Sequence, residues 1–329
     1  MKSSFLTVPF APLAIFCVSI TSFCLAAEPI KAEQINAGQI VAGERAAGER
    51  AAGESALSAI ELGKVEIPRT QVFELTDPVS KRVYPLWVKL PRSYQPDSTR
   101  RYPVIYVSDA PYAFQIVSGM TRFPMNSGKM REAIIVGLSY AKGDKGPQSR
   151  VRDYTPFSDT DWKLTTGGAS HYADYLQTQV LPFMAEHYRV DDKERTFVGN
   201  SLGGLLGAYL LLERPNLFDN YVLGSPSVWF KGEQILSLKA KERAKDKQLL
   251  KRRVFLAVGA LETPDKGDMQ HDMVAGADKL RAHLKHQLGD LIELESLTIE
   301  GARHETAFPT TASQGLYWLL ARDGQNSTR

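Results

Sequence analysis

Apolar residues follow two different periods along this chain. Short apolar and β-branched runs predict buried strands, and apolar residues spaced three and four positions apart predict helices. Strands are predicted within 64–75, 82–90, 102–109, 133–140, 195–200, 220–225, 253–259 and 293–301. Helices are predicted at about Tyr172–Tyr188, along LLGAYLLLER after Ser201, along the basic stretch that begins at Lys239, and at about Met269–Gln287 and Ala312–Arg322. Strands that alternate with helices predict an α/β fold with a mostly parallel sheet covered on both faces.

The first two strands form an exception to this alternation. The turn-forming sequence TDPVSK separates them, which predicts an antiparallel pair at the start of the fold. No second linker interrupts the chain after Gly63. We therefore predict one folded domain over residues 63–329.

The chain begins with features of a secretory signal peptide. Lys2 precedes the apolar run FLTVPFAPLAIFCVSI, and small residues follow before Glu28, so residues 1–27 are predicted to be removed on export. The run is short, contains two prolines and is followed by no second apolar span, which disfavours a membrane anchor. We expect an exported protein, most simply periplasmic, with secretion as the alternative.

Residues 28–62 lack the pattern of a folded module. An imperfect five-residue repeat of Ala, Gly, Glu and Arg runs from Ala37 to Ala56, and it presents no apolar face. This composition is typical of a flexible tether.

Cysteine use and charge narrow the class of protein. Both cysteines, Cys17 and Cys24, lie in the predicted signal peptide, so the mature domain needs no disulfide. A lipoprotein attached through Cys24 is disfavoured because bulky Phe23 precedes it. The net charge of +3 becomes +2 when Lys2 is removed, which is too small to indicate a nucleic-acid partner. The basic stretch from Lys239 to Arg253 is predicted to be the solvated face of a helix.

A catalytic motif lies where the strand RTFVGN meets a helix. Ser201 stands between Gly199 and Gly203 in the pattern Gly-x-Ser-x-Gly. At a strand-to-helix junction this pattern predicts a nucleophile elbow, a strained turn that leaves the serine hydroxyl exposed above the sheet. The bland alternative is a glycine-rich turn with an incidental serine.

A serine nucleophile needs a base, and the base needs a group that orients it. Enzymes with this elbow place an Asp or Glu and then a His after the serine. His304 follows the last predicted strand, in a loop at the carboxyl edge of the sheet, whereas His283 and His286 lie within a helical run. Glu262 lies nearest the end of the strand RVFLAVG and is the candidate for the group that orients the histidine. The alternative is that Glu262 is a solvated loop carboxylate and that the enzyme works with a Ser–His pair.

An oxyanion hole would use two backbone N–H groups. Leu202, at the start of the elbow helix, supplies one of them. The loop after YPVIYVSD supplies the other, most plausibly from Ala110 because Pro111 has no N–H.

The chain resembles the putative-esterase family of α/β-hydrolases, which includes esterase D, mycolyltransferases and enterobactin-type siderophore esterases. The similar segments are RRYPVIYVSDA, VRDYTP, the run from FVGNSLGG to SPSVWF, VGALE and GARHETAFP, from about Arg82 to Phe308. The resemblance implies Ser201 as the nucleophile, His304 as general base and acid, and Glu262 as the acid of the triad. The chain departs from the family pattern at Ala110, where glycine is usual, and at Asn200, where histidine is frequent.

Four aromatic and basic side chains are candidates for substrate contact. Tyr112 and Trp229 could face an aromatic group, with core packing as the alternative. Arg152, with Arg150, could bind an anionic group. A pair between Arg152 and a neighbouring carboxylate is the favoured alternative.

These observations predict a serine carboxylic-ester hydrolase that needs no cofactor or metal and acts on a small-molecule ester, of siderophore type or another aromatic type. Acyl transfer and polysaccharide de-esterification are alternatives within the same fold. A binding protein that kept the fold is a third, which the intact Ser201, Glu262 and His304 set disfavours.

Overall fold

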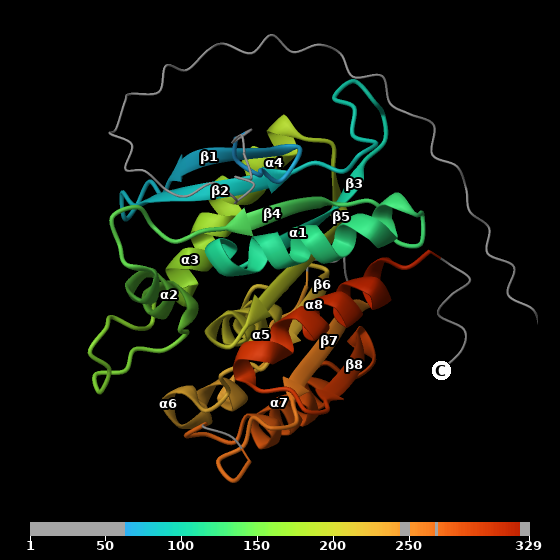
Figure 1. Ribbon diagram of the computed structural model, residues 1–329. Helices are drawn as coiled ribbons and strands as arrows, with labels where there is room; N and C mark the ends of the chain where they lie inside the picture. Colours follow the sequence, from blue (N-terminus) through green and yellow to red (C-terminus); the bar gives the residue numbers. More distant parts are fainter. Residues whose placement is uncertain (1–62, 244–250, 267–268, 323–329) are drawn as a thin grey trace, which may run out of the picture. The chain divides into compact units, whose positions relative to one another are not determined.

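A sheet of eight strands runs through residues 63–243, 251–266 and 269–322, the part of the chain that the computed structural model describes (Figure 1). The strand order is β1-β2-β4-β3-β5-β6-β7-β8. The strands are β1 (Thr70–Thr76), β2 (Val83–Lys89), β3 (Tyr102–Val107), β4 (Ile134–Leu138), β5 (Val190–Asn200), β6 (Asn220–Gly224), β7 (Arg252–Gly259) and β8 (Ile292–Ile299). β2 pairs antiparallel with β1 and β4, and every other pair is parallel. The mostly parallel sheet and the opening antiparallel pair are thus confirmed.

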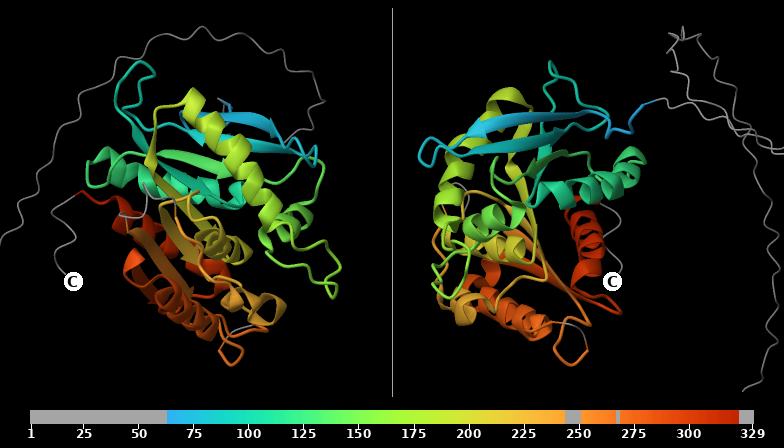
Figure 2. Two further views of the ribbon diagram at one scale, coloured as in Figure 1. Left: turned by 180° about the vertical axis from the view of Figure 1, so that it is seen from behind. Right: turned by 60° about the vertical axis from the view of Figure 1, so that its left-hand side comes forward.

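Helices cover both faces of this sheet. The α-helices are α1 (Ala110–Asn126), α2 (Gly146–Tyr154), α3 (Ala169–Tyr175), α4 (Leu181–His187), α5 (Leu202–Glu213), α6 (Phe230–Glu233), α7 (Met273–Leu288) and α8 (His304–Leu320). α1 and α8 lie on one face of the sheet in Figure 1, and the view from behind in Figure 2 shows α3, α4, α5 and α7 on the other. The predicted two-sided cover is present.

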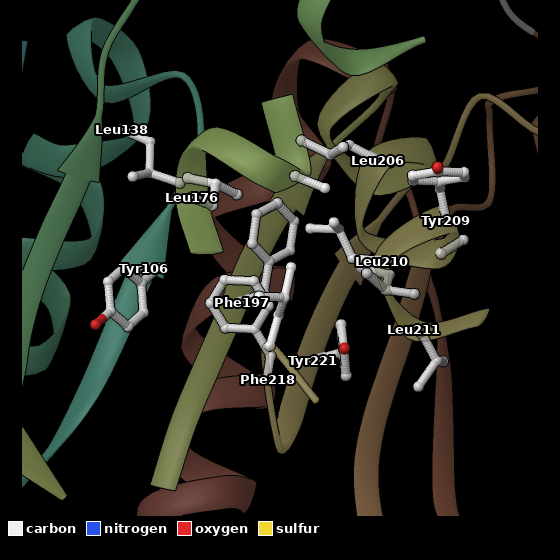
Figure 3. Packing of buried hydrophobic residues seen from close by; sticks show 14 of the residues in the cluster. Tyr106, Leu138, Leu176, Phe197, Leu206, Tyr209, Leu210, Leu211, Phe218 and Tyr221 are labelled. Atoms are coloured by element: carbon white, nitrogen blue, oxygen red, sulfur yellow. The ribbon is translucent and has the colours of Figure 1, made fainter. Parts of the chain in front are cut away.

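The core on the α5 face holds the helix that follows Ser201 in place. Phe218 packs between Tyr106 of β3 and Phe197 of β5, with ring centroids 5.5 and 5.3 Å apart (Figure 3). α5 is buried on all sides from Leu202 to Leu212. A helix that is apolar all round lies inside a protein rather than on its surface. The junction between β5 and α5 is therefore fixed from both sides.

The helices α1 and α2, and the short α6, were not anticipated from the sequence. The run that forms α1 carries Pro111 and Pro124, and the run that forms α2 begins with Gly146 and Pro147, so neither shows an uninterrupted helical pattern. The helix predicted at Tyr172–Tyr188 is present as α3 and α4, joined by a π-helical turn at Leu176–Val180. Pro182 has no N–H to donate, which favours such a local change in hydrogen bonding.

The basic stretch and the last helix differ from expectation. Residues 239–243 are not helical, and 244–250 lie outside the described residues, so the predicted solvated helix is wrong where it can be checked. Arg243 and Arg252 are buried instead, because Arg243 pairs with Asp219 at 2.6 Å and Arg252 donates to the Leu211 carbonyl at 3.0 Å. The last helix begins at His304 rather than near Ala312.

The N-terminal predictions fall on residues that the structure does not describe. The signal peptide at 1–27 and the tether at 28–62 both lie outside the described ranges. One compact unit spans Gly63–Arg329. No helix in the described ranges has the length and apolar character needed to cross a membrane.

Candidate active site

Ser201 occupies a strained turn between β5 and α5. Its backbone angles are φ 59° and ψ −118°, a conformation that costs free energy for a residue with a Cβ atom. The Ser201 N–H donates to the Gly224 carbonyl at 2.9 Å, and this bond fixes the turn against β6. The geometry is that of a nucleophile elbow.

The two flanking glycines are required by close contacts. A Cβ atom on Gly199 would lie 2.2 Å from the Gly203 carbonyl oxygen, and one on Gly203 would lie 2.5 Å from the Ser108 hydroxyl. Neither neighbour is the end of a flexible chain that could move aside at little cost. The Gly-x-Ser-x-Gly spacing thus follows from sterics at this turn.

Glu262 is held at the carboxyl end of β7. The residue is fully buried, and its Oε1 accepts hydrogen bonds from the Ser225 hydroxyl at 2.6 Å and the Gly259 N–H at 2.7 Å. Its other oxygen, Oε2, lies 2.6 Å from His304 Nδ1. Glu262 is therefore not a solvated loop carboxylate, and the buried bonds leave it one orientation.

His304 is the first residue of α8 rather than a loop residue. Its side chain is partly exposed, and it reaches Glu262 across 42 positions in sequence. A neutral imidazole that donates Nδ1–H to a carboxylate keeps Nε2 free to accept a proton. The Glu262–His304 pair therefore has the form of an oriented general base.

The Ser201 hydroxyl has a different partner in this structure. Its Oγ lies 3.3 Å from Ser227 Oγ, and the Ser227 N–H donates to the Ser201 carbonyl at 3.1 Å. Between the described residues Ser201 and His304 no hydrogen bond is present. In hydrolases without ligand such bonds are often long.

Both predicted oxyanion donors stand at helix N-termini. Leu202 is the first residue of α5, after Ser201, and Ala110 is the first residue of α1, after Asp109. N–H groups in the first turn of a helix have no acceptor within that helix, and the helix dipole favours negative charge there. The contact between Ser108 and Gly203 brings the two helix starts together.

A network that the sequence interpretation missed connects these two helix starts. Asp109 has left-handed backbone angles, and its Oδ1 accepts from Tyr140 Oη at 2.6 Å and Arg150 Nε at 2.8 Å. Arg150 also donates to the Asn200 carbonyl at 3.0 Å, directly before Ser201. Burial and the Asp109 carboxylate raise the pKa of Tyr140 well above its ordinary value, so its hydroxyl stays protonated and donates.

Sequence signals for this network exist, but they are weak. Asp109 follows β3 by two positions, Tyr140 follows β4 by two positions, and Arg150 directly precedes the segment VRDYTP. Residues just after parallel strands gather at one edge of the sheet. Only the fold shows that these three meet.

Tyr112 lies beside the helix that begins with His304. Its ring centroid is 5.7 Å from that of Phe308, one helical turn after His304, and half of the Tyr112 side chain is exposed. This placement leaves the ring available next to the candidate base.

Trp229 follows the Ser225–Ser227 segment that contacts both Glu262 and Ser201. It stacks on His271 with centroids 4.2 Å apart and lies parallel to Trp162 at 6.1 Å. His271 is thus a partner of Trp229 rather than the start of α7, which begins at Met273. These rings form a partly exposed aromatic stack two residues beyond Ser227.

Arg152 points away from these groups. Its guanidinium pairs with Asp153 at 2.8 Å and with Asp144 at 2.5 Å, and it also donates to the Tyr84 hydroxyl. The pairing with neighbouring carboxylates matches the alternative given for it above. We therefore leave Arg152 out of the substrate contacts proposed below.

Three further histidines bond to nearby groups, and the described residues contain no cluster of metal ligands. His171 pairs with Asp77, His187 contacts the Phe183 carbonyl, and His283 contacts the Leu238 carbonyl. In the ranges that the structure describes, no three His, Cys, Asp or Glu side chains are grouped so that they could hold a metal ion.

Comparisons with known proteins extend over most of the described domain. The family model described as "Putative esterase" matches residues 79–297. Ferri-bacillibactin esterase BesA of Bacillus subtilis is 28% identical over 278 residues, covering 78% of this chain and 91% of the relative. The siderophore triacetylfusarinine C esterase of Aspergillus fumigatus is 28% identical over 158 residues, covering 46% of this chain and 54% of the relative.

Solved structures of related hydrolases share the fold of this chain. The BES protein from Bacillus cereus superposes with a TM-score of 0.68 at 26% identity, covering 80% of this chain and all of that one. The siderophore hydrolase EstB from Aspergillus nidulans superposes with a TM-score of 0.63 at 21% identity, covering 79% and 97% of the two chains. The predicted α/β-hydrolase fold is confirmed.

Proposed function

Because the chain belongs to the esterase family of α/β-hydrolases, we propose that it is a serine carboxylic-ester hydrolase that works through an acyl-enzyme. The observation that carries this proposal is the buried carboxylate of Glu262, which holds His304 Nδ1 at 2.6 Å close to the elbow of Ser201. The relatives whose printed names state an activity are esterases, which agrees with the reaction class.

Each residue has a defined part in the proposed reaction. His304 Nε2 takes the Ser201 proton while Oγ bonds to the ester carbonyl carbon, and the carbonyl π electrons move onto oxygen. The N–H groups of Leu202 and Ala110 stabilise this oxyanion. When it collapses, the carbon–alkoxy bond breaks and His304 returns the proton to the departing alcohol. Water then repeats these steps on the acyl-enzyme and releases the acid.

We propose an ester of siderophore type or with another aromatic acyl group as the substrate. BesA and the Aspergillus fumigatus relative carry siderophore esterase names. The Trp229 stack and the half-exposed ring of Tyr112 flank the Ser201 region, and flat aromatic groups stack well on such rings.

The test compares Ser201 with Ser227, whose Oγ atoms lie 3.3 Å apart. Purified protein is assayed on p-nitrophenyl esters of increasing acyl size and on ferric and iron-free tricatecholate trilactones, beside Ser201→Ala and Ser227→Ala. We expect turnover and fluorophosphonate labelling to disappear in Ser201→Ala and to persist in Ser227→Ala. Full turnover in Ser201→Ala would refute the proposal. Transfer to added alcohols in excess of free acid would indicate an acyltransferase instead.

Export is a separate proposal that depends on residues 1–27 alone. Expression of the full chain followed by cell fractionation and N-terminal sequencing tests it. We expect a periplasmic protein that begins near Glu28. A cytoplasmic protein that retains Met1–Lys2 would contradict it.

A further inference from the structure

A buried lysine lies at the end of β2, beside the middle of α1. Lys89 is the last residue of β2, and only 7% of it is exposed. Side chains alternate along a strand, and since Leu86 and Val88 face the α5 side of the sheet, Lys89 lies on the α1 side. Its Nζ donates to the Ser118 carbonyl of α1 at 2.8 Å. An ammonium has three donors, so this bond leaves two of them.

Two exposed arginines lie beside this buried charge. Arg69, before β1, and Arg122, one turn after Ser118 in α1, line the same cavity as Lys89. Burial first, and then these two guanidinium groups, lower the pKa of Lys89 to about 8. Arg69 Nε donates only to the Leu90 carbonyl, at 3.2 Å. Among the described residues no carboxylate forms an ion pair with Lys89, Arg69 or Arg122.

Nearby acidic residues do not neutralise this positive charge. Glu66 lines the same cavity but is exposed, and it is not among the charges that act on Lys89. Glu132 lines the adjoining pocket, and its carboxylate forms an ion pair with the Arg100 guanidinium at 3.4 Å. Among the described residues Lys89, the one buried cation of the three, thus has no matched carboxylate, which is costly at a buried position.

The space between these cations is open. The cavity has a volume of about 220 Å³, several times the roughly 30 Å³ that a water molecule occupies in the liquid. A Cβ atom on Gly119 would meet nothing within 4 Å, so this helix position is empty on the cavity side. The Ser118 hydroxyl is buried beside it and has no hydrogen-bond partner.

We propose that this cavity binds a small oxyanion, such as a phosphate, sulfate or carboxylate group. Lys89 Nζ and the guanidinium groups of Arg69 and Arg122 supply the donors. Charge-assisted hydrogen bonds from ammonium and guanidinium groups are the strong ones in proteins, and a partly buried position reduces their screening by water. The ligand would balance the charge that the fold leaves unpaired. The site is separate from Ser201 and does not depend on the proposed function.

Inorganic phosphate is the probe for this site. Binding is measured by calorimetry and by thermal unfolding in a buffer free of other oxyanions, with sodium chloride at equal ionic strength as the reference. We expect saturable one-to-one binding and a phosphate-dependent rise in Tm for the mature protein. Ser201→Ala should bind phosphate equally, which separates this result from any failure of the esterase proposal.

Two variants test the assignment, and one controls for general charge. Lys89→Met keeps the length of the side chain without its charge and should abolish binding. Arg122→Gln, at an exposed position where folding is not at stake, should weaken binding at least tenfold. Lys285→Met removes an exposed charge on α7 and should have no effect. Unchanged affinity in Arg122→Gln, equal Tm shifts with sodium chloride, or no saturable binding in the wild type would overturn the proposal.

Discussion

Arg150 donates to the carboxylate of Asp109 at 2.8 Å, and this pair sits between the two helix starts from which an oxyanion would be bound. The same guanidinium reaches the Asn200 carbonyl at 3.0 Å. The Arg150 side chain thus links the residue before Ala110 to the residue before Ser201. A catalytic site is sensitive to such spacing, because donors act only at the place where charge develops.

The first prediction concerns this link. Arg150→Met should lower kcat by about 10²-fold, the effect of a misplacement near 1 Å. KM should change less, because the alteration acts on the transition state rather than on ground-state binding. Breaking this mostly buried pair should also lower the free energy of unfolding by about 2–4 kcal/mol. Steady-state kinetics and urea unfolding measure the two effects.

A positioning role predicts more than a loss of stability. Arg152→Met disrupts an equally dense set of ion pairs that does not touch Asn200, and it provides the control. It should lower stability with kcat nearly unchanged. If both variants lose kcat in proportion to their loss of stability, Arg150 has no special relation to the site.

The second prediction concerns the triad acid. Glu262→Gln keeps the size of the side chain but removes the charge that stabilises an imidazolium at His304, so kcat should fall by about 10²–10⁴-fold. Asp265 is an exposed carboxylate in the same loop, and Asp265→Asn should retain full kcat. Steady-state kinetics on one p-nitrophenyl ester compare kcat of the two variants. Equal activity of the two variants would mean that Ser201 and His304 suffice as a pair.

The third prediction concerns the aromatic stack. Trp229→Ala should lower kcat/KM for benzoyl esters about 2–10-fold relative to acetyl esters of the same alcohol, the range expected for one aromatic contact. Phe123→Ala removes an aromatic ring that is exposed elsewhere, on α1, and should leave the ratio unchanged. An unchanged ratio in Trp229→Ala would place the acyl group away from this stack.

The fourth prediction concerns acid stability. Asp77 is buried, which alone raises its pKa, but hydrogen bonds from Ser80, His171 and the Val79 N–H outweigh burial and lower it to about 2. A depressed carboxyl pKa stabilises the fold above the ordinary value of 3.8, and this contribution is lost as the pH falls toward about 2. Asp77→Asn should therefore be less stable at pH 7 and less sensitive to acid between pH about 4 and 2.

Urea unfolding at several pH values measures this difference. Asp97→Asn, at an exposed position after β2, should keep the acid sensitivity of the wild type. If Asp77→Asn loses stability with the same slope as the wild type, other carboxylates govern acid unfolding.

Local patterns in the sequence were sufficient for the sheet and for the elbow. The strands β3 and β4 are buried along their whole length, so they appear as unbroken apolar runs, and the spacing of Gly199, Ser201 and Gly203 follows from contacts around one turn. Helices with interrupted patterns were missed, as in α1, where Pro111 and Pro124 hide the helical period. The start of α8 at His304 was missed as well, because Pro309 within it resembles a boundary.

The sequence by itself determined the fold class, the elbow at Ser201 and the order in which Glu262 and His304 follow it. Only the tertiary structure decided which side chains orient them. Ser225 reaches Glu262 across 37 positions, Arg150 reaches Asp109 across 41, and Arg252 is buried although its neighbours in sequence are basic. Periodicity reports what lies within a few residues, whereas the first two contacts join segments at the carboxyl edge of the parallel sheet, and Arg252 meets α5 at the other end of β7. No local pattern contains that information, because the partners are neighbours only after folding.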